Sequence, residues 1–381
     1  MLCYRYRSGS ELCMKELIYD EMFFATAEEC NDPYEGKMFA EFPADEECWT
    51  NLIKVVSGSM SAELQKKVVD FFMEKSPIGM DEVIKMPEEP LLLLAQNLTE
   101  IIYLKHAIIN LKDYITQYMP PEKYFVCFSK TPDNYLMWSH YANNHRGYCL
   151  IFRSADGGIR QCPRRKRTRL SYDTPRSFSK HMSFEIGEKF MLKNVNYVET
   201  PPIINAFMCF PAAVNGNKYS QEEFDAHLQE YENVYYCKHS VWEYEQEARI
   251  VLSSGIPWLT GERISVSLHK RLFHYDSTQL VGIVFGARMA TEQKNRIREI
   301  IKEKIESWHD GSRENKVIYD FVIFEEQLSE VRREITIEPV EIYSLIGVQK
   351  DDPKFKERYE EWEKGTAIQY ERNGARRVQV P

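Results

Sequence analysis

The sequence predicts an α+β protein with a mixed, curved β-sheet as its core, a helical insertion and a C-terminal βαβ unit. Residues 2–7 alternate in polarity, which is the period of a β-strand. Between about residues 46 and 121 the apolar residues recur at helical spacing instead, with prolines between the segments. Residues 280–286 are apolar throughout, which is typical of a buried strand.

The first strand, residues 2–7, places Arg5 and Arg7 on one face because side chains alternate along a strand. A Ser-Gly-Ser turn then caps a helix predicted over residues 11–22. If the face with the two arginines lines a cleft, their guanidinium groups can bind a phosphate or a carboxylate. The alternative is an exposed edge strand that its charges protect from aggregation.

The strand predicted over residues 124–128 ends at Ser129 and leads into a helix with unusual side chains. Within four positions this helix carries Trp138, His140 and Tyr141. Each polar tip needs a partner once it is buried, so this density indicates the wall of a pocket. The alternative is a core helix whose polar tips are satisfied.

The middle of the chain alternates between predicted strands and helices. Residues 148–152 predict a strand, and the apolar and aromatic stretches 184–191 and 203–210 favour helices. Residues 221–232 predict a helix with an acidic first turn, and residues 235–252 predict a long strand region.

The last part of the predicted sheet is a βαβ unit. The buried strand at 280–286 is followed by a polar helix at about 291–308 and a strand at 317–324. Such a unit is expected to be parallel, with a right-handed crossover. We therefore expect a single α+β domain over residues 1–350, and a charged, peripheral tail over residues 351–381.

Composition narrows the class of protein. The 381 residues carry a formal charge of -9, which argues against a wholly basic nucleic-acid binder. The nine cysteines include no close-spaced pairs, so reduced thiols are expected. No apolar run approaches the ~20 residues of a spanning helix, and the N-terminal segment lacks the apolar core of a signal peptide. We expect a soluble, cytoplasmic protein with no membrane contact.

An acidic run lies within the strand predicted over residues 235–252. Period two places Glu243, Glu245 and Glu247 on one face with Arg249, opposite an apolar face. Glutamates at this spacing repel one another and are disfavoured in strands. They indicate either a carboxylate site for a developing positive charge or a hydroxyl proton, or a solvated face neutralised by Arg249 and nearby lysines.

Residues 160–169 form a dense basic run inside an acidic protein, with Arg164, Arg165, Lys166 and Arg167 at its centre. The run is a candidate contact for nucleic acid or another polyanion. The alternative is a solvated loop.

No metal site is expected from the histidines. His140 and His145 are separated by a predicted helix end, whereas a zinc helix carries its two histidines one turn apart.

The motifs occur in a specific order. They are Tyr-Arg-Tyr-Arg at 4–7, Asn-Asp-Pro-Tyr-Glu at 31–35, Met-Trp-Ser-His-Tyr-Ala at 137–142 and Trp-Glu-Tyr-Glu-Gln-Glu-Ala-Arg-Ile at 242–250. This order resembles a widespread bacterial family known as domain of unknown function 2971. The resemblance covers most of the chain, but the family name implies no chemistry.

A second likeness does imply chemistry. A strand-borne arginine, an aromatic and serine segment and a Glu-x-Glu strand resemble the plan of the ADP-ribosyltransferases. The likeness implies an intracellular bacterial enzyme that binds and cleaves NAD, either an ADP-ribosyltransferase or an NAD glycohydrolase, in a toxin or a phage-defence effector. The implied roles are phosphate binding by Arg5, ribose or amide binding by Ser129, stacking by Tyr141 or Trp138, a further nucleotide contact by His140, acceptor or ribose orientation by Glu245, and catalysis by Glu247.

Two other functions fit the same residues. The first is a non-catalytic module of a defence system that senses a small molecule or a partner. The second is a metal-dependent nuclease, with Asp32, Glu35, Glu245 and Glu247 as hard oxygen ligands and the basic run as a guide for nucleic acid.

Overall fold

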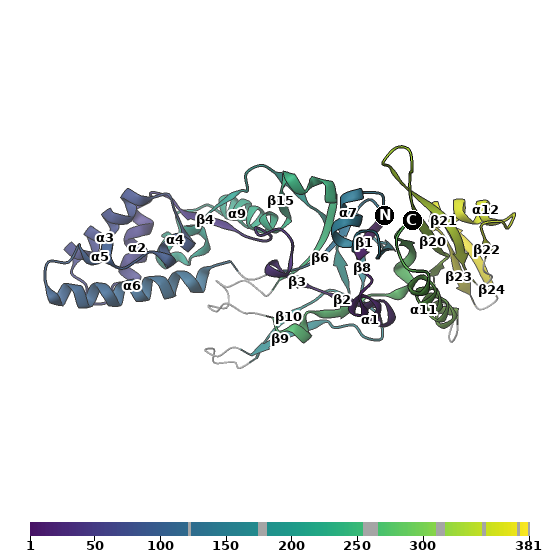
Figure 1. The fold of residues 1–381 in the computed structure, drawn as a ribbon. Coiled ribbons are helices and arrows are strands. Elements are labelled where there is room, and N and C mark those ends of the chain that lie inside the picture. Colours follow the sequence, from purple (N-terminus) through teal and green to yellow (C-terminus); the bar gives the residue numbers. More distant parts are fainter. Residues whose placement is uncertain are drawn as a thin grey trace.

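The computed structural model describes residues 1–120, 123–173, 181–253, 266–309, 317–344, 348–371 and 374–379. The molecule is elongated (Figure 1). A group of helices forms one end, the large sheet lies in the middle, and the C-terminal elements form the other end.

The large sheet has ten strands in the described part of the chain. They are β1 (Leu2–Arg7), β3 (Ala25–Thr26), β6 (Lys123–Ser129), β7 (Tyr148–Arg153), β12 (Lys193–Asn194), β16 (Glu247–Ser253), β18 (Leu280–Phe285), β20 (Phe321–Leu328), β21 (Ile335–Tyr343) and β22 (Val348–Gln349). Their order is β12-β16-β6-β1-β7-β18-β20-β21-β22, and β3 also pairs with β6. β18 and β20 are parallel while their other neighbours are antiparallel, so the predicted mixed α+β class and the βαβ unit are confirmed.

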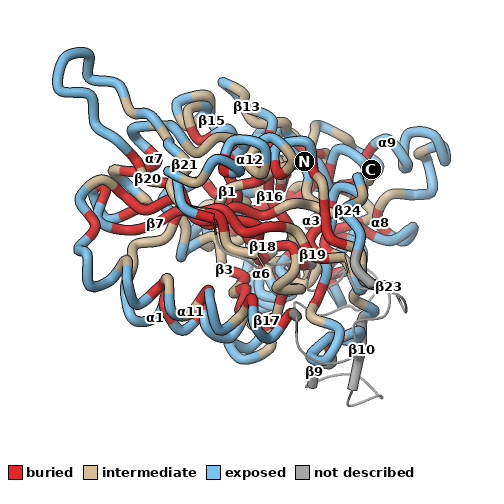
Figure 2. The backbone as a smooth tube through the Cα atoms, turned by 90° about the vertical axis from the view of Figure 1, so that its right-hand side faces the viewer, coloured by how far each residue is buried: buried red, intermediate tan, exposed pale blue. Residues whose placement is uncertain are grey.

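Helices cover both faces of this sheet. α1 (Glu11–Tyr19) and α11 (Thr291–His309) contribute Leu17 and Ile301 to the core on one face. α7 (Tyr135–Tyr141) and α12 (Phe355–Glu363) contribute Trp138 and Trp362 to the core on the other face. Figure 2 shows that the buried residues follow the central strands between these layers.

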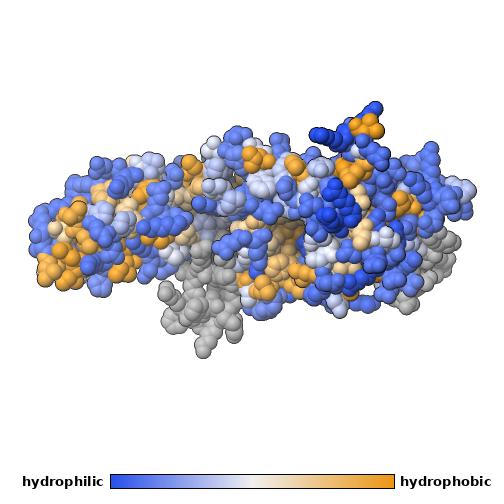
Figure 3. Space-filling view, viewed as in Figure 1, coloured by the Kyte–Doolittle hydropathy of each residue, from blue (hydrophilic) through white to orange (hydrophobic). Residues whose placement is uncertain are grey.

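The helical end consists of α2 (Glu46–Val56), α3 (Ala62–Lys75), α4 (Met80–Lys85), α5 (Glu89–Leu92) and α6 (Leu98–Tyr118), in the region where an insertion was predicted. It has a core of its own, in which Trp49 and Phe72 stack with their ring centroids 4.6 Å apart. The same core includes residues of α8 (Ala212–Asn215) and α9 (Gln221–Asn233), and of the small sheet of β4 (Phe39–Phe42), β5 (Ile78–Gly79) and β14 (Ile203–Asn205). Figure 3 shows apolar surface at this end, where α6 exposes Leu98, Ile102 and Ile109.

Short elements complete the described structure. The remaining strands are β2 (Glu21–Phe23), β8 (Gly158–Arg160), β9 (Arg169–Asp173), β10 (His181–Glu185), β11 (Lys189–Met191), β13 (Asn196–Val198), β15 (Cys237–His239), β17 (Leu272–His274), β19 (Val317–Tyr319), β23 (Thr366–Glu371) and β24 (Gly374–Gln379). Among the helices of the described residues, none has both the length and the apolar character needed to cross a membrane.

The predicted strand over residues 235–252 is not continuous. β15 and β16 are separated by a 3₁₀ turn at Ser240–Glu245, after which Gln246 has the left-handed backbone angle φ of 45°. Two predicted helices, over residues 184–191 and 203–210, are also wrong. These stretches contain short strands instead, and a 3₁₀ turn follows β14. Phe190 therefore reaches a core from a strand, and Phe207 and Phe210 reach another from a turn.

The segment after residue 351 is not peripheral, so this prediction is wrong. Trp362 of α12 is buried and donates a hydrogen bond from Nε1 to the Val281 carbonyl at 3.0 Å. Arg358 contacts both carboxylate oxygens of Asp320, at 2.8 and 3.0 Å. β23 pairs with β19, so the tail completes both a core and a small sheet.

β1 and β6 are neighbours that diverge. β1 pairs with β7 along its whole length. With β6, in contrast, Tyr4 and Ser129 form the one residue pair recorded between these two fully described strands. Farther along β6, the place beside Phe125 is taken by Ala25 of β3. We call the resulting opening between β1 and β6 the fork.

Candidate functional site

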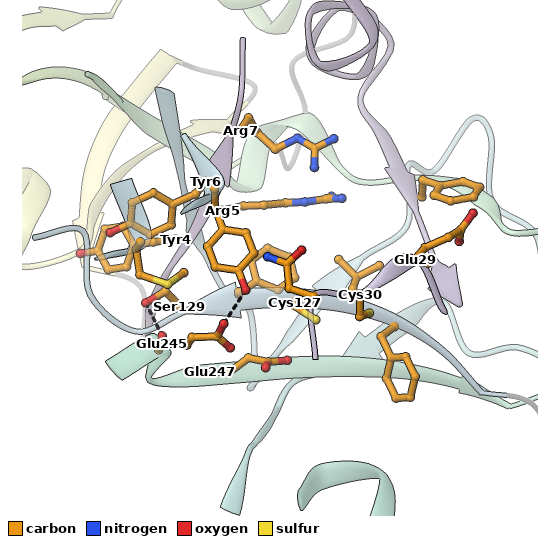
Figure 4. Close-up of a pocket in the computed structure, with 18 of the residues that line it drawn as sticks. Tyr4, Arg5, Tyr6, Arg7, Glu29, Cys30, Cys127, Ser129, Glu245 and Glu247 are labelled. Atoms are coloured by element: carbon orange, nitrogen blue, oxygen red, sulfur yellow. Dashed lines mark hydrogen bonds between the residues drawn. The ribbon is translucent and has the colours of Figure 1, made fainter. Parts of the chain in front are cut away.

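The fork contains a cavity of about 460 Å³, which we call the fork cavity. Its volume lies in the range of ~300–1,000 Å³ that is usual for small-molecule sites. Residues of β1 and β6 form its two long walls, and Lys238, Glu245 and Glu247 form one end. Five of the predicted site residues line it: Arg5, Ser129, Tyr141, Glu245 and Glu247. Figure 4 shows the two β1 arginines along one side and the two glutamates along the opposite side.

Arg5 is a buried cation with no partner among the described residues. Its side chain points into the fork cavity (Figure 4), and the residue is only 9% exposed. In the described part of the chain no carboxylate, carbonyl or hydroxyl accepts a hydrogen bond from its guanidinium. Burial lowers the pKa of Arg5 from its usual value, yet an arginine stays charged at neutral pH. The cavity wall therefore presents an uncompensated positive charge.

Arg7, two residues further along β1, is paired. Its guanidinium contacts Glu16 of α1 in an ion pair, and both side chains are largely buried. Burial, and after it the nearby charge of Arg5, lowers the pKa of Arg7 to about 10. Of the two arginines predicted to bind an anion, Arg5 alone is without a carboxylate partner among the described residues.

Glu245, Tyr141 and Lys238 meet at the opposite end. The Tyr141 hydroxyl donates to Glu245 Oε1 at 2.5 Å, and Lys238 Nζ donates to Glu245 Oε2 at 2.6 Å. Burial raises the pKa of Glu245, and the charge of Lys238 offsets only part of this increase. Burial and the adjacent Glu245 also raise the pKa of Tyr141. This end therefore holds a carboxyl group that is easier to protonate than usual.

Glu247 belongs to a tighter network. Its Oε1 and Oε2 accept hydrogen bonds from Nε and Nη2 of Arg249 at 2.6 and 2.7 Å. Arg249 also donates to Glu35, at 2.5 and 3.2 Å, and is completely buried. Burial acts to raise the pKa of Glu247, but the charge and hydrogen bonds of Arg249, together with the charge of Lys238, lower it below its usual value. The alternative of a solvated acidic face is thus wrong for Glu245 and Glu247, and only Glu243 is exposed.

Ser129 positions the backbone beside Glu245. Its hydroxyl donates to the Glu245 carbonyl at 2.8 Å and accepts a hydrogen bond from the Thr131 N–H at 3.2 Å. The first contact follows from the end of β6 lying next to the start of β16, where Glu247 pairs with Ser129, and the second is local to the end of β6. Ser129 lines the fork cavity, but its hydroxyl already has partners.

Trp138 and His140 do not line the fork cavity. Trp138 is buried in the core above the sheet, where its Nε1 donates to the Pro132 carbonyl at 2.8 Å and its ring meets Tyr6 edge-on at 5.2 Å. His140 is exposed on the other side of α7, near the ring of Tyr244. A helix turns by about 100° per residue, so adjacent positions point to different sides. Of the predicted aromatic stacking residues, Tyr141 alone faces the cavity.

The basic run is mostly engaged within the protein. Arg167 donates to the carbonyls of Lys270 and Leu272 at 2.8 and 2.9 Å, and its guanidinium lies over the ring of Phe273. Lys166 forms an ion pair with Glu188, and Arg165 donates to the Tyr19 carbonyl at 3.3 Å. Arg164 is exposed.

Lys238 is the main site residue that the sequence did not predict. It lies on the three-residue strand β15 and contacts Glu245 at 2.6 Å, Glu247 at 3.4 Å and Glu35 at 3.5 Å. The acidic residues raise the pKa of Lys238 despite its burial. Its partner Glu35 comes from a turn about 200 residues earlier, so spacing along the chain carries no signal of this network.

The carboxylates proposed as nuclease ligands do not form one set. Glu35, Glu245 and Glu247 surround Lys238, whereas Asp32 lines a separate cavity. Within the described residue ranges, no group of three or more His, Cys, Asp or Glu side chains is arranged to hold a metal ion.

Comparison with known proteins covers one part of this site. Residues 137–250 match the family model described as "Protein of unknown function (DUF2971)". The matched segment includes Tyr141, Lys238, Glu245, Glu247 and Arg249 but not Arg5. No curated protein and no solved structure matches the chain, and no comparison links it to the ADP-ribosyltransferases. The acidic end of the fork cavity thus lies within a segment similar to the DUF2971 family, whose description gives no activity.

Proposed function

We propose that this chain is an enzyme that binds NAD in the fork cavity and breaks the bond between nicotinamide and ribose. The observation that carries the proposal is the guanidinium of Arg5, which has no partner among the described residues and lies across the cavity from Glu245 (Figure 4), the carboxylate bound by Tyr141 and Lys238. A cation at one end and carboxylates at the other suit a ligand with a phosphate and a positively charged reacting centre.

Arg5 supplies the phosphate contact in this proposal. A buried charge without a partner is unfavourable, and a bound phosphate gives it charge-assisted hydrogen bonds. Because Arg7 is already paired with Glu16, Arg5 is the better candidate. The aromatic side chains of Tyr4, Phe128 and Tyr141 also line the cavity and offer flat surfaces to a base or a nicotinamide ring.

The acidic end supplies the chemistry. When the carbon–nitrogen bond breaks, its electron pair leaves with nicotinamide, and the sugar carbon becomes positively charged. A carboxylate aimed at such a carbon stabilises the transition state. The acceptor hydroxyl or water then forms the new bond to carbon, and its proton passes to a carboxylate of the site.

Glu245 fits these roles better than Glu247. The pKa of Glu245 is raised, so its carboxylate can take up a proton closer to neutral pH. Both oxygens of Glu247 are bound to the cation Arg249, whereas Lys238 donates to one oxygen of Glu245 and the other accepts from the neutral Tyr141 hydroxyl. We assign Glu245 as the catalytic residue, and Glu247 with Arg249 as the pair that holds the end of the cavity in place.

The test is incubation of the purified protein with NAD, with nicotinamide release followed by chromatography. We expect release from wild-type protein, a decrease of about 10²–10³ in rate for Glu245→Gln, and weaker NAD binding for Arg5→Lys. Glu243→Gln is the matched control, because Glu243 lies two residues from Glu245 but is exposed. No release by the wild type with any acceptor, or full activity of Glu245→Gln, would refute the assignment.

A second candidate function is ligand sensing without turnover. It is favoured because Glu245 is paired with Lys238 and Glu247 with Arg249. A carboxylate whose charge is already neutralised stabilises a positive transition state less. This function predicts that ADP-ribose or NAD raises the melting temperature through Arg5 and is recovered unchanged.

A further inference from the structure

A second cavity, of about 230 Å³, shares Lys238 with the acidic end of the fork cavity. Its walls are mostly apolar and include Phe39, Val198, Pro201 and Val234. An apolar cavity of about 150 Å³ is known to hold a benzene molecule, so this one has room for a single aromatic ring with a short chain.

Asp32 is the charged acceptor in this apolar cavity. The residue is 4% exposed, and its Oδ1 accepts a hydrogen bond from the Tyr34 N–H at 2.9 Å. In the ranges that the structure describes, no donor reaches the second oxygen, Oδ2. Asp32 and Glu35 belong to one turn, in which the Glu35 N–H donates to the Asp32 carbonyl. The two side chains line different cavities: Glu35 lines the fork cavity and Asp32 lines the second one.

The cations around Asp32 are engaged elsewhere. Lys238 lines the same cavity, but its Nζ binds Glu245 at 2.6 Å. Lys37 places its Nζ over the rings of Tyr34 and Phe39, 5.6 and 5.3 Å from their centroids. A carboxylate in mostly apolar surroundings gains from a donor that reaches its second oxygen. Among the described residues, the cavity therefore offers no donor to Asp32 Oδ2.

We propose that this cavity binds a small apolar molecule that carries a protonated amine, with the ammonium group donating to Asp32 Oδ2. The apolar walls bury the ring or aliphatic body, and Asp32 selects for the charge. This site is separate from the fork cavity, and the inference stands whether or not the chain cleaves NAD.

Three ligands of similar shape provide the test: phenethylamine, phenethyl alcohol and hydrocinnamate. Affinities are measured by calorimetry, or by ligand-observed NMR when binding is weak. A hydrogen bond between charged groups contributes ~1.5–3 kcal/mol, so phenethylamine is expected to bind at least about tenfold tighter than the alcohol. Hydrocinnamate, which carries a negative charge, is expected not to bind.

Two variants and one control complete the design. Asp32→Asn keeps an oxygen for the Tyr34 N–H, so the turn is retained, and it should remove the preference for the amine. Val198→Phe fills the cavity and should remove binding of both the amine and the alcohol. Asp70→Asn, on an exposed position of α3 at the far end of the molecule, should bind like the wild type. Equal affinities for amine and alcohol, unchanged binding by Asp32→Asn, or no binding of any ligand at millimolar concentration would overturn the proposal.

Discussion

Replacing Arg5 by methionine should make the protein more stable, although it removes a buried side chain from a central strand. Arg5 has no carboxylate partner within the described structure, and its charge also acts against Arg7. Methionine has a similar length and needs no hydrogen bonds. Arg7→Met, two residues away, should have the opposite effect, because it leaves Glu16 largely buried without its partner.

The size of each effect follows from burial. A buried polar group without a partner costs ~1–3 kcal/mol, and the value for Arg5 is at the lower end because its guanidinium faces a cavity. We expect Arg5→Met to raise the free energy of unfolding by about 1 kcal/mol, and Arg7→Met to lower it by about 1–3 kcal/mol. The unfolding entropy of ~2.1 cal/mol/K per residue converts 1 kcal/mol to about 1 °C for a chain of this length.

Urea unfolding followed by tryptophan fluorescence, with calorimetry for the melting temperature, measures both variants beside the wild type. ADP-ribose provides a second comparison: it should stabilise the wild type and lose this effect in Arg5→Met. If Arg5→Met were destabilised as strongly as Arg7→Met, Arg5 would have a stabilising partner, and the argument for an anion site would fail.

Three further predictions concern the same region. Arg249→Met leaves Glu35 and Glu247 buried without their cation and should lower the free energy of unfolding by about 3–5 kcal/mol, as urea titration would show. Because the folded-state pKa of Glu245 is raised above its usual 4.5, the stability that protonation gives is present below that pH and is lost as pH rises through the folded value. Unfolding curves between pH 4 and 8 should therefore show wild type losing stability relative to Glu245→Gln as pH rises, and a constant difference would contradict this. Trp138→Phe should cost about 1–3 kcal/mol of stability without changing ligand affinity, because Trp138 is a core residue.

The parts of the fold with local signals were predicted well. β1 is found at residues 2–7 as predicted, and α11 extends one residue beyond the predicted helix. The side chains of β1 alternate with the period of a strand and those of α11 recur with the period of a helix, so each element can be identified from its own residues. The tail was misjudged although Phe355, Tyr359 and Trp362 have helical spacing and form an apolar stripe. The high charge of the segment hides this stripe, because most positions between the three aromatic residues are charged.

The acidic site was predicted only in part, for a physical reason. The Glu-x-Glu pattern drew attention to Glu245 and Glu247, but the left-handed turn at Gln246 places the two carboxylates on different elements. The pKa of Glu245 is raised and that of Glu247 is lowered, and this difference depends on burial and on contacts with Lys238 and Arg249. Such contacts join distant segments, and no period along the chain reports them.

The fork also bears on how the molecule can move. β1 lies between two halves of the sheet, one with β16 and β6 and the other with β7 and β18. Its ladder with β6 consists of the pair Tyr4 and Ser129. A joint one residue wide resists twisting far less than a full ladder does. A molecule that contacts Arg5 on one half and Glu245 on the other would cross-link the two halves of the sheet. Such a cross-link would restrict rotation of the helical end relative to the C-terminal end.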